Sequence, residues 1–154
     1  MIKLKDILLE SDVPDIFVPR RIEDRFERMI KDYIRKGSKG DINISFKNLK
    51  KIPEILKGLT INGNFYCNDN KLTSLVGAPK IVSGNFTCSD NKLSSLVGAP
   101  KKIGGDFYCS NNKLTSLDGC PKYVGKDFYC YKNSLKFTEE QIRAVCNVKG
   151  KVVV

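Results

Sequence analysis

The sequence predicts a repeat solenoid in which one short strand from each repeat stacks into a parallel sheet. A Phe-x-Cys phrase recurs every 21 residues, with an asparagine three residues after each cysteine and a leucine two residues after each asparagine. A fixed period of about 20 to 50 residues is typical of solenoids, propellers and arrays. The repeated cysteines are Cys67, Cys88, Cys109 and Cys130.

The strands are predicted from the Phe-x-Cys phrase, because side chains two residues apart in a strand lie on the same side of the sheet. Phenylalanine and cysteine are therefore expected in the core, and the residue between them on the outside. Divergent copies with Ile or Val in both core positions extend the row at each end. The six expected strands are Ile42–Ile44, Phe65–Cys67, Phe86–Cys88, Phe107–Cys109, Phe128–Cys130 and Val152–Val154.

Corner residues follow each expected strand. The asparagine, such as Asn70, is expected to hydrogen-bond backbone groups of neighbouring coils, which a buried bend otherwise leaves unpaired. Leu72 and Leu75 then return to the core, and a Gly-Ala-Pro run at 77–79 forms the next corner. Val82 closes the coil before the next strand begins.

Both ends of the array are expected to be covered, because repeat arrays need terminal caps. Apolar residues at helical spacing predict a helix over Arg21–Lys36, between Pro19 and Gly37. A capping box at 138–141 starts a second helix that reaches about Val145. The predicted segments are a leader and linker (1–19), an N-terminal capping helix (20–39), the array (40–137) and a C-terminal cap of helix and last strand (138–154).

Over residues 40–135 the unit G-[ND]-F-x-C-x-x-N-[KS]-L resembles the leucine-rich repeat, in which L-x-x-L-x-L-x-x-N-x-L forms the strand and the turn. Phe and Cys replace the strand leucines, and one extra residue precedes the strand. A unit of 21 residues is short for that family. The resemblance therefore implies a parallel sheet with a mostly non-helical convex side, of extended or 3₁₀ backbone.

The composition argues against several kinds of segment and site. The 154 residues carry a net charge of +10, include no histidine, and contain no apolar run long enough to cross a membrane. The segment Met1–Glu10 is interrupted by charged residues and does not form a signal peptide. A reducing cytoplasm is expected, so the cysteines are interpreted as a buried thiol ladder without disulfides. Without histidine or a Cys-x-x-Cys pair, no metal site is expected.

Outward strand residues form columns that can bind a protein. Tyrosine offers rigid amphipathic area, and short polar residues beside it are typical of recognition faces. Aromatic residues on neighbouring strands also stabilise a sheet by pairing, and this alternative remains open. The candidate protein-binding residues are Tyr66, Thr87, Tyr108, Tyr129, Tyr131, Asp106 and Asp127.

Lysines form two further columns, which either keep the protein soluble or contact phosphates. Coils about 4.8 Å apart would hold the ammonium groups closer together than the phosphates of one nucleic-acid strand. No arginine cluster is present to contact base edges, so nucleic acid is the less favoured partner. The candidate phosphate contacts are Lys71, Lys92, Lys113, Lys80, Lys101 and Lys122.

Catalysis is not expected, and neither is a cofactor. No histidine is present to act as a base near neutral pH. Asp106 and Asp127 neighbour each other on an open face without a predicted cleft, and Cys120 lacks a partner that would activate its thiol.

Two resemblances concern the source of the protein. Leu8-Leu9-Glu10 resembles the apolar-x-Glu sites at which large tailed bacteriophages cut leaders from head proteins, which would leave Ser11 as the new N-terminus. The repeats resemble Cys-x-x-Asn-x-Leu arrays of phage proteins. Together they imply a phage protein in the host cytoplasm, or one packaged in the phage head and delivered with DNA.

The resulting hypothesis is a monomeric, non-enzymatic module that binds a host protein through its outer strand face, with no membrane contact. The alternative is an internal head protein that associates with DNA without sequence preference, through the lysine columns.

Overall fold

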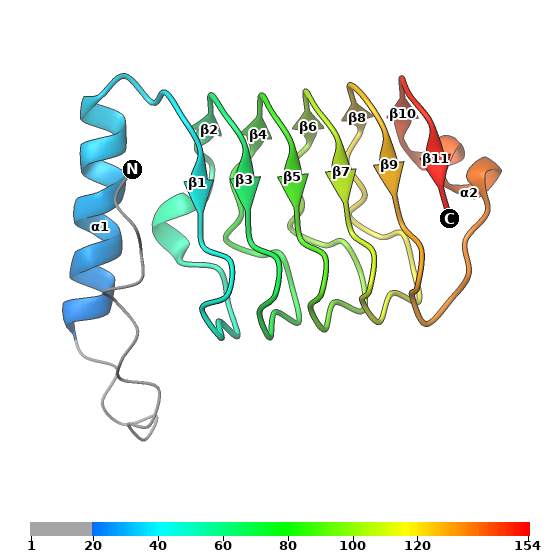
Figure 1. Ribbon diagram of the computed structural model, residues 1–154, viewed down its shortest axis with the longest axis horizontal. Helices are drawn as coiled ribbons and strands as arrows, with labels where there is room; N and C mark the ends of the chain where they lie inside the picture. Colours follow the sequence, from blue (N-terminus) through cyan, green and yellow to red (C-terminus); the bar gives the residue numbers. More distant parts are fainter. Residues whose placement is uncertain (1–19) are drawn as a thin grey trace.

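The computed structural model describes residues 20–154, and side chains from residue 26 onward (Figure 1). The predicted solenoid is confirmed: successive coils of the chain stack side by side in a row between two helices. The predicted leader and linker (1–19), with the predicted cleavage site at Glu10, lie outside the described residues.

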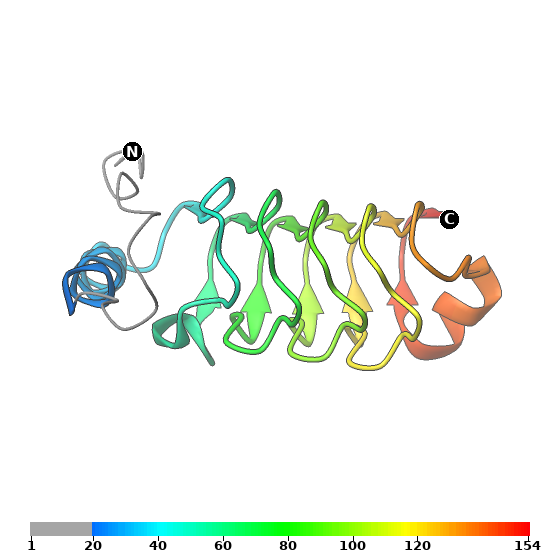
Figure 2. The same ribbon diagram turned by 90° about the horizontal axis from the view of Figure 1, so that it is seen from below.

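Two parallel sheets form the opposite walls of the solenoid (Figures 1 and 2). The first sheet has six strands in the order β1-β3-β5-β7-β9-β11, and the second has five in the order β10-β8-β6-β4-β2. The first sheet comprises β1 (Ile42–Asn43), β3 (Phe65–Tyr66), β5 (Phe86–Thr87), β7 (Phe107–Tyr108), β9 (Phe128–Tyr129) and β11 (Val152–Val153). The second comprises β2 (Thr60–Ile61), β4 (Ile81–Val82), β6 (Lys102–Ile103), β8 (Tyr123–Val124) and β10 (Asn147–Val148).

The six predicted strands are confirmed as the first sheet, each shorter than predicted. The second sheet was not predicted, because each of its strands contains only one buried apolar residue, which is too weak a pattern to indicate a strand. In β6, for example, Ile103 is fully buried while Lys102 is exposed. Extended segments at the same position of successive coils form backbone hydrogen bonds with each other, and this pairing does not depend on their outward side chains. The side expected to be mostly non-helical is therefore largely a sheet, with one 3₁₀ turn, η3 (Glu54–Leu56), in the first coil.

The core lies between the two sheets. The phenylalanines of β3, β5, β7 and β9 are all fully buried. The Phe65 and Phe86 rings stack with centroids 5.4 Å apart, and the Phe107 and Phe128 rings meet edge to face at 4.9 Å. The cysteine of each repeat lies two residues further along and is also buried. The Phe-x-Cys phrase therefore defines the interior, as predicted.

A ladder of buried asparagines joins successive coils. Asn91 donates through Nδ2 to the carbonyls of Cys67 (3.0 Å) and Cys88 (3.1 Å), and its Oδ1 accepts from the Leu72 N–H at 3.0 Å. Asn70 and Asn112 make equivalent bonds one coil earlier and one coil later. The predicted role of the repeated asparagine is therefore confirmed.

The two predicted helices are confirmed at the ends of the row. Helix α1 (Arg20–Arg35) packs against η3 and buries Phe26 and Ile30. Helix α2 (Glu139–Val145) begins with the predicted capping box. Neither of these described helices is long and apolar enough to cross a membrane.

Candidate protein-binding face

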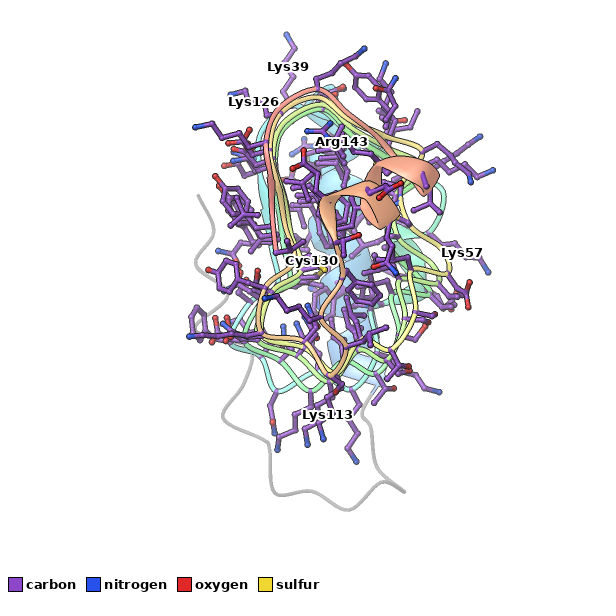
Figure 3. The ribbon with its side chains drawn as sticks, turned by 90° about the vertical axis from the view of Figure 1, so that its right-hand side faces the viewer. Lys39, Lys57, Lys113, Lys126, Cys130 and Arg143 are labelled. Carbon is purple, nitrogen blue, oxygen red and sulfur yellow. The ribbon has the colours of Figure 1, made fainter. Side chains whose placement is uncertain are left out.

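The outer surface of the first sheet, called the aromatic face below, carries the candidate protein-binding residues. Figure 3 views the molecule along the row of coils, with this face on the left-hand side. The aromatic face is defined by Tyr66, Thr87, Tyr108, Tyr129 and Tyr131, together with the polar side chains that flank them on the same wall. Parallel register brings Tyr66 beside Thr87, Thr87 beside Tyr108, and Tyr108 beside Tyr129.

Two of these tyrosines form an ordered pair. The rings of Tyr108 and Tyr129 stack with centroids 4.6 Å apart and planes inclined by 4°. The Tyr129 hydroxyl donates to Asp127 Oδ2 at 3.2 Å, and the Tyr108 hydroxyl donates to Asp106 Oδ2 at 3.4 Å. Partial loss of solvent contact, reinforced by the carboxylates, raises the pKa of both phenols. Both rings are thus neutral, oriented and half-exposed near neutral pH.

The other predicted residues are less closely connected. Thr87 separates Tyr66 from the stacked pair, because it occupies the tyrosine position in the intervening strand. Tyr131 is 40% exposed and follows β9 at the edge of the face. The structure therefore brings together Tyr108, Tyr129 and their two aspartates, and leaves Tyr66 two coils from Tyr108.

Asp106 and Asp127 also belong to a second ladder, which sequence reasoning missed. Each side chain accepts a hydrogen bond from a backbone N–H of the next coil: Asp106 Oδ1 from Asp127 N at 3.0 Å, and Asp127 Oδ1 from Lys151 N at 2.8 Å. Asp41, Asn64 and Asn85 make the same bond in the earlier coils. Both oxygens of each aspartate therefore have internal partners, so these residues hold the tyrosines in place and join the coils.

Three further residues of this wall were not predicted as contacts. Asp69 and Asp90 occupy the corner just after the strands in the left-handed region, with φ of 53° and 56°. Phe46 occupies the equivalent corner of the first coil, with φ of 57° and 72% of its surface exposed. An aromatic side chain at positive φ is uncommon, and such positions concentrate at functional sites. The sequence feature that could have indicated these positive-φ corners is the Asp or Asn that recurs just before the ladder asparagines, as at Asp69, Asp90 and Asn111.

The two predicted lysine columns lie apart. Lys71, Lys92 and Lys113 stand at the corner that follows the first sheet, and Lys113 points outward at the lower end of the coil in Figure 3. Lys80, Lys101 and Lys122 stand at the start of the second-sheet strands, on the opposite wall. The structure thus places the phosphate-contact candidates on two separate surfaces.

The cysteines lie in the interior of the solenoid. All six are free and buried. Burial raises the pKa of the Cys67, Cys88 and Cys109 thiols, which disfavours the thiolate needed for nucleophilic attack or metal binding. Hydrogen bonds from Cys109 and Cys120 lower the pKa of Cys130 and Cys146, respectively. Among the described residues, no group of His, Cys, Asp and Glu is arranged to hold a metal ion.

No protein-family model, curated protein or solved structure matches the chain.

Proposed function

We propose that the protein is a non-enzymatic binding module that docks a protein partner on its aromatic face. The stacked Tyr108–Tyr129 pair is the observation that supports this proposal most directly. Exposed tyrosines contribute large contact areas, and ordering them before binding lowers the entropy lost on association. The aspartates that hold both hydroxyls provide that order.

The charge of the aromatic face indicates the chemistry of the partner. Although the whole chain carries a net charge of +10, this wall collects carboxylates. They belong to Asp41, Asp69, Asp90, Asp106 and Asp127. Asp90 is exposed, and its carboxylate forms no hydrogen bond or ion pair with another described residue. A partner with Arg or Lys at the contact would pair with these carboxylates, and an arginine could stack on the tyrosine rings.

The resemblances to leucine-rich repeats and to phage arrays favour a partner from a bacterial host. Leucine-rich-repeat-like arrays present rigid sheets for recognition, and the resemblance to phage arrays favours a bacterial host protein. In this proposal the protein acts as a monomer in the host cytoplasm.

Affinity capture with paired baits tests the proposal. The double variant Tyr108→Ala/Tyr129→Ala removes the stacked pair, and Tyr123→Ala removes a half-buried tyrosine from the second sheet as a matched control. We expect a host protein to be enriched on the unaltered chain and on the control, and to be lost from the double variant. Circular dichroism melts confirm that all three baits are folded.

Two results would separate binding from sheet stabilisation. If the double variant melts at the control temperature but no longer binds, the pair is a contact. If captured proteins are retained in full while the melting temperature falls, the tyrosines stabilise the sheet and the proposed face is wrong.

A further inference from the structure

The second sheet carries a surface of opposite charge, called the lysine face below. It is defined by Lys80, Lys101, Lys102 and Lys122, all exposed, together with the half-buried Tyr123. Lys102 lies over the Tyr123 ring, with Nζ 5.5 Å from the ring centroid. None of the four lysines forms an ion pair with a described acidic residue.

Backbone hydrogen bonds fix three of these lysines in a column. Lys101 N donates to Lys80 O at 2.9 Å, and Lys122 N donates to Lys101 O at 2.9 Å. The neighbouring coils are therefore about 4.8 Å apart at this column. Lysines whose backbones lie this close concentrate positive charge along the column, which favours the gathering of anions there.

We propose that the lysine face binds the phosphate backbone of single-stranded nucleic acid without sequence preference. Only the lysine column repeats on this wall, whereas the outward strand positions hold five different residues: Thr60, Ile81, Lys102, Tyr123 and Asn147. Repeated positive charge attracts a polyanion. Because the other side chains of this surface do not repeat, they cannot recognise the same base or side chain at each step along the ligand. Tyr123 adds a ring on which a base can stack.

The spacing of the column is compatible with this ligand. Phosphates along one strand are further apart than neighbouring coils, but each ammonium group ends a four-carbon stem that is exposed to solvent. The stems spread to follow the backbone, because this kind of binding depends on charge density and does not require a fixed register.

Two other polyanionic partners are less favoured. A membrane surface would be bound more firmly if apolar side chains inserted, yet none of the large exposed apolar residues lies on the second-sheet strands. An acidic protein would be recognised by a specific pattern of side chains, whereas positive charge is the feature that repeats on the lysine face. The second lysine column is a weaker candidate, because Asp69 and Asp90 stand two residues before Lys71 and Lys92.

The test compares two variants with the same change of charge. One replaces Lys80, Lys101 and Lys122 by glutamine, and the matched control replaces Lys71, Lys92 and Lys113 by glutamine. Binding to a fluorescein-labelled oligodeoxythymidine is followed by polarisation from low salt to about 200 mM, where electrostatic binding weakens steeply. For the first variant we expect weaker binding at every salt concentration, and a salt slope smaller by about 2, at about 0.7 per lost phosphate contact. The control should retain the original slope.

Several outcomes would overturn the proposal. These are equal losses in both variants, no binding at low salt, or tighter binding to phosphatidylserine vesicles or polyglutamate than to the oligonucleotide. The double variant Tyr108→Ala/Tyr129→Ala should bind the oligonucleotide normally, so failure of the aromatic face and failure of the lysine face are distinguishable.

Discussion

At the scale of single residues, the buried asparagines do what a hydrophobic side chain of the same size could not. Asn91 is 8% exposed, and its amide group bonds to backbone atoms of two successive coils. It thereby satisfies backbone groups that the tight bend turns away from water. One side chain in each repeat fixes both the bend and the position of the neighbouring coil.

Replacing Asn91 by alanine should therefore cost more stability than most substitutions. The carbonyls of Cys67, Cys88 and Ser89 lose a donor, and the Leu72 N–H loses its acceptor. Each carbonyl keeps a second donor, so the Leu72 N–H is the group left unpaired, and we expect the free energy of unfolding to fall by about 1–3 kcal/mol in urea titrations. Asn133→Ala is the comparison, because Asn133 is only half-buried. An equal loss at the two positions would contradict this account.

The same residue scale shows where sequence reasoning succeeds. The core positions of Phe107 and Cys109 follow from a strand period of two, and the bonding of Asn70 follows from its place at a buried bend. The roles of Asp106 and Asp127 were predicted incompletely, because an aspartate on an outward strand position has the pattern of a surface residue. Whether its side chain bends toward a neighbouring backbone N–H depends on the distance between coils, which the pattern alone does not supply.

At the scale of elements, α2 closes the C-terminal end of the row. Ile142 is fully buried against the last coil, and Arg143 donates to the carbonyls of Val148 (2.7 Å) and Gly150 (2.8 Å). The helix therefore fastens the chain between β10 and β11. Its start depends on Thr138, whose Oγ1 accepts from Gln141 N at 3.2 Å, while Thr138 N donates to Gln141 Oε1 at 2.9 Å.

Loss of this cap should have a measurable effect. Thr138→Ala removes the acceptor at the helix start, and we expect the free energy of unfolding to fall by about 1 kcal/mol. Ser134→Ala, in the exposed turn that precedes the helix, serves as the control and should change little. Chemical denaturation followed by circular dichroism measures both. A Thr138→Ala chain as stable as the control would mean that packing alone holds α2 in place.

A comparison of the two sheets explains why the first sheet was predicted from the sequence and the second was not. The first sheet has two core residues in each strand phrase, whereas the second has one, such as Val82 in β4. A single apolar residue per repeat does not distinguish a strand from an irregular segment. The pairing arises from the stacking of whole coils, so the sequence of one coil does not contain it.

At the scale of the whole molecule, the cysteine ladder makes stability depend on pH. Burial raises the pKa of the Cys67 and Cys88 thiols in the folded state, while unfolded thiols ionise near about 8.5. In the hydrogen-bonded pair of Cys109 and Cys130 the two pKa values shift in opposite directions, so their contributions offset each other. A group whose pKa is raised on folding contributes stability that is fully present below its unfolded pKa and is lost as the pH rises above it.

The free energy of unfolding should therefore fall between about pH 8.5 and pH 9.5, by about 1 kcal/mol over that interval for each thiol that stays protonated. Urea titrations under reducing conditions, at several values between about pH 7 and pH 9.5, measure the slope. In the Cys88→Ala variant, the free energy of unfolding should decrease less steeply with pH, because one thiol no longer contributes. A stability that does not change over this range, or an unchanged slope in the variant, would show that these thiols ionise in the folded state.

The constant register of the coils has a consequence for the size of both faces. Phe65 pairs with Phe86 in the first sheet just as Ile81 pairs with Lys102 in the second, so one coil contributes one strand to each wall. Adding or removing a 21-residue unit would therefore lengthen or shorten both walls by the same step of about 4.8 Å. The two surfaces cannot be resized independently. The number of coils would therefore set the size of the proposed protein-binding face and of the proposed phosphate-binding face together.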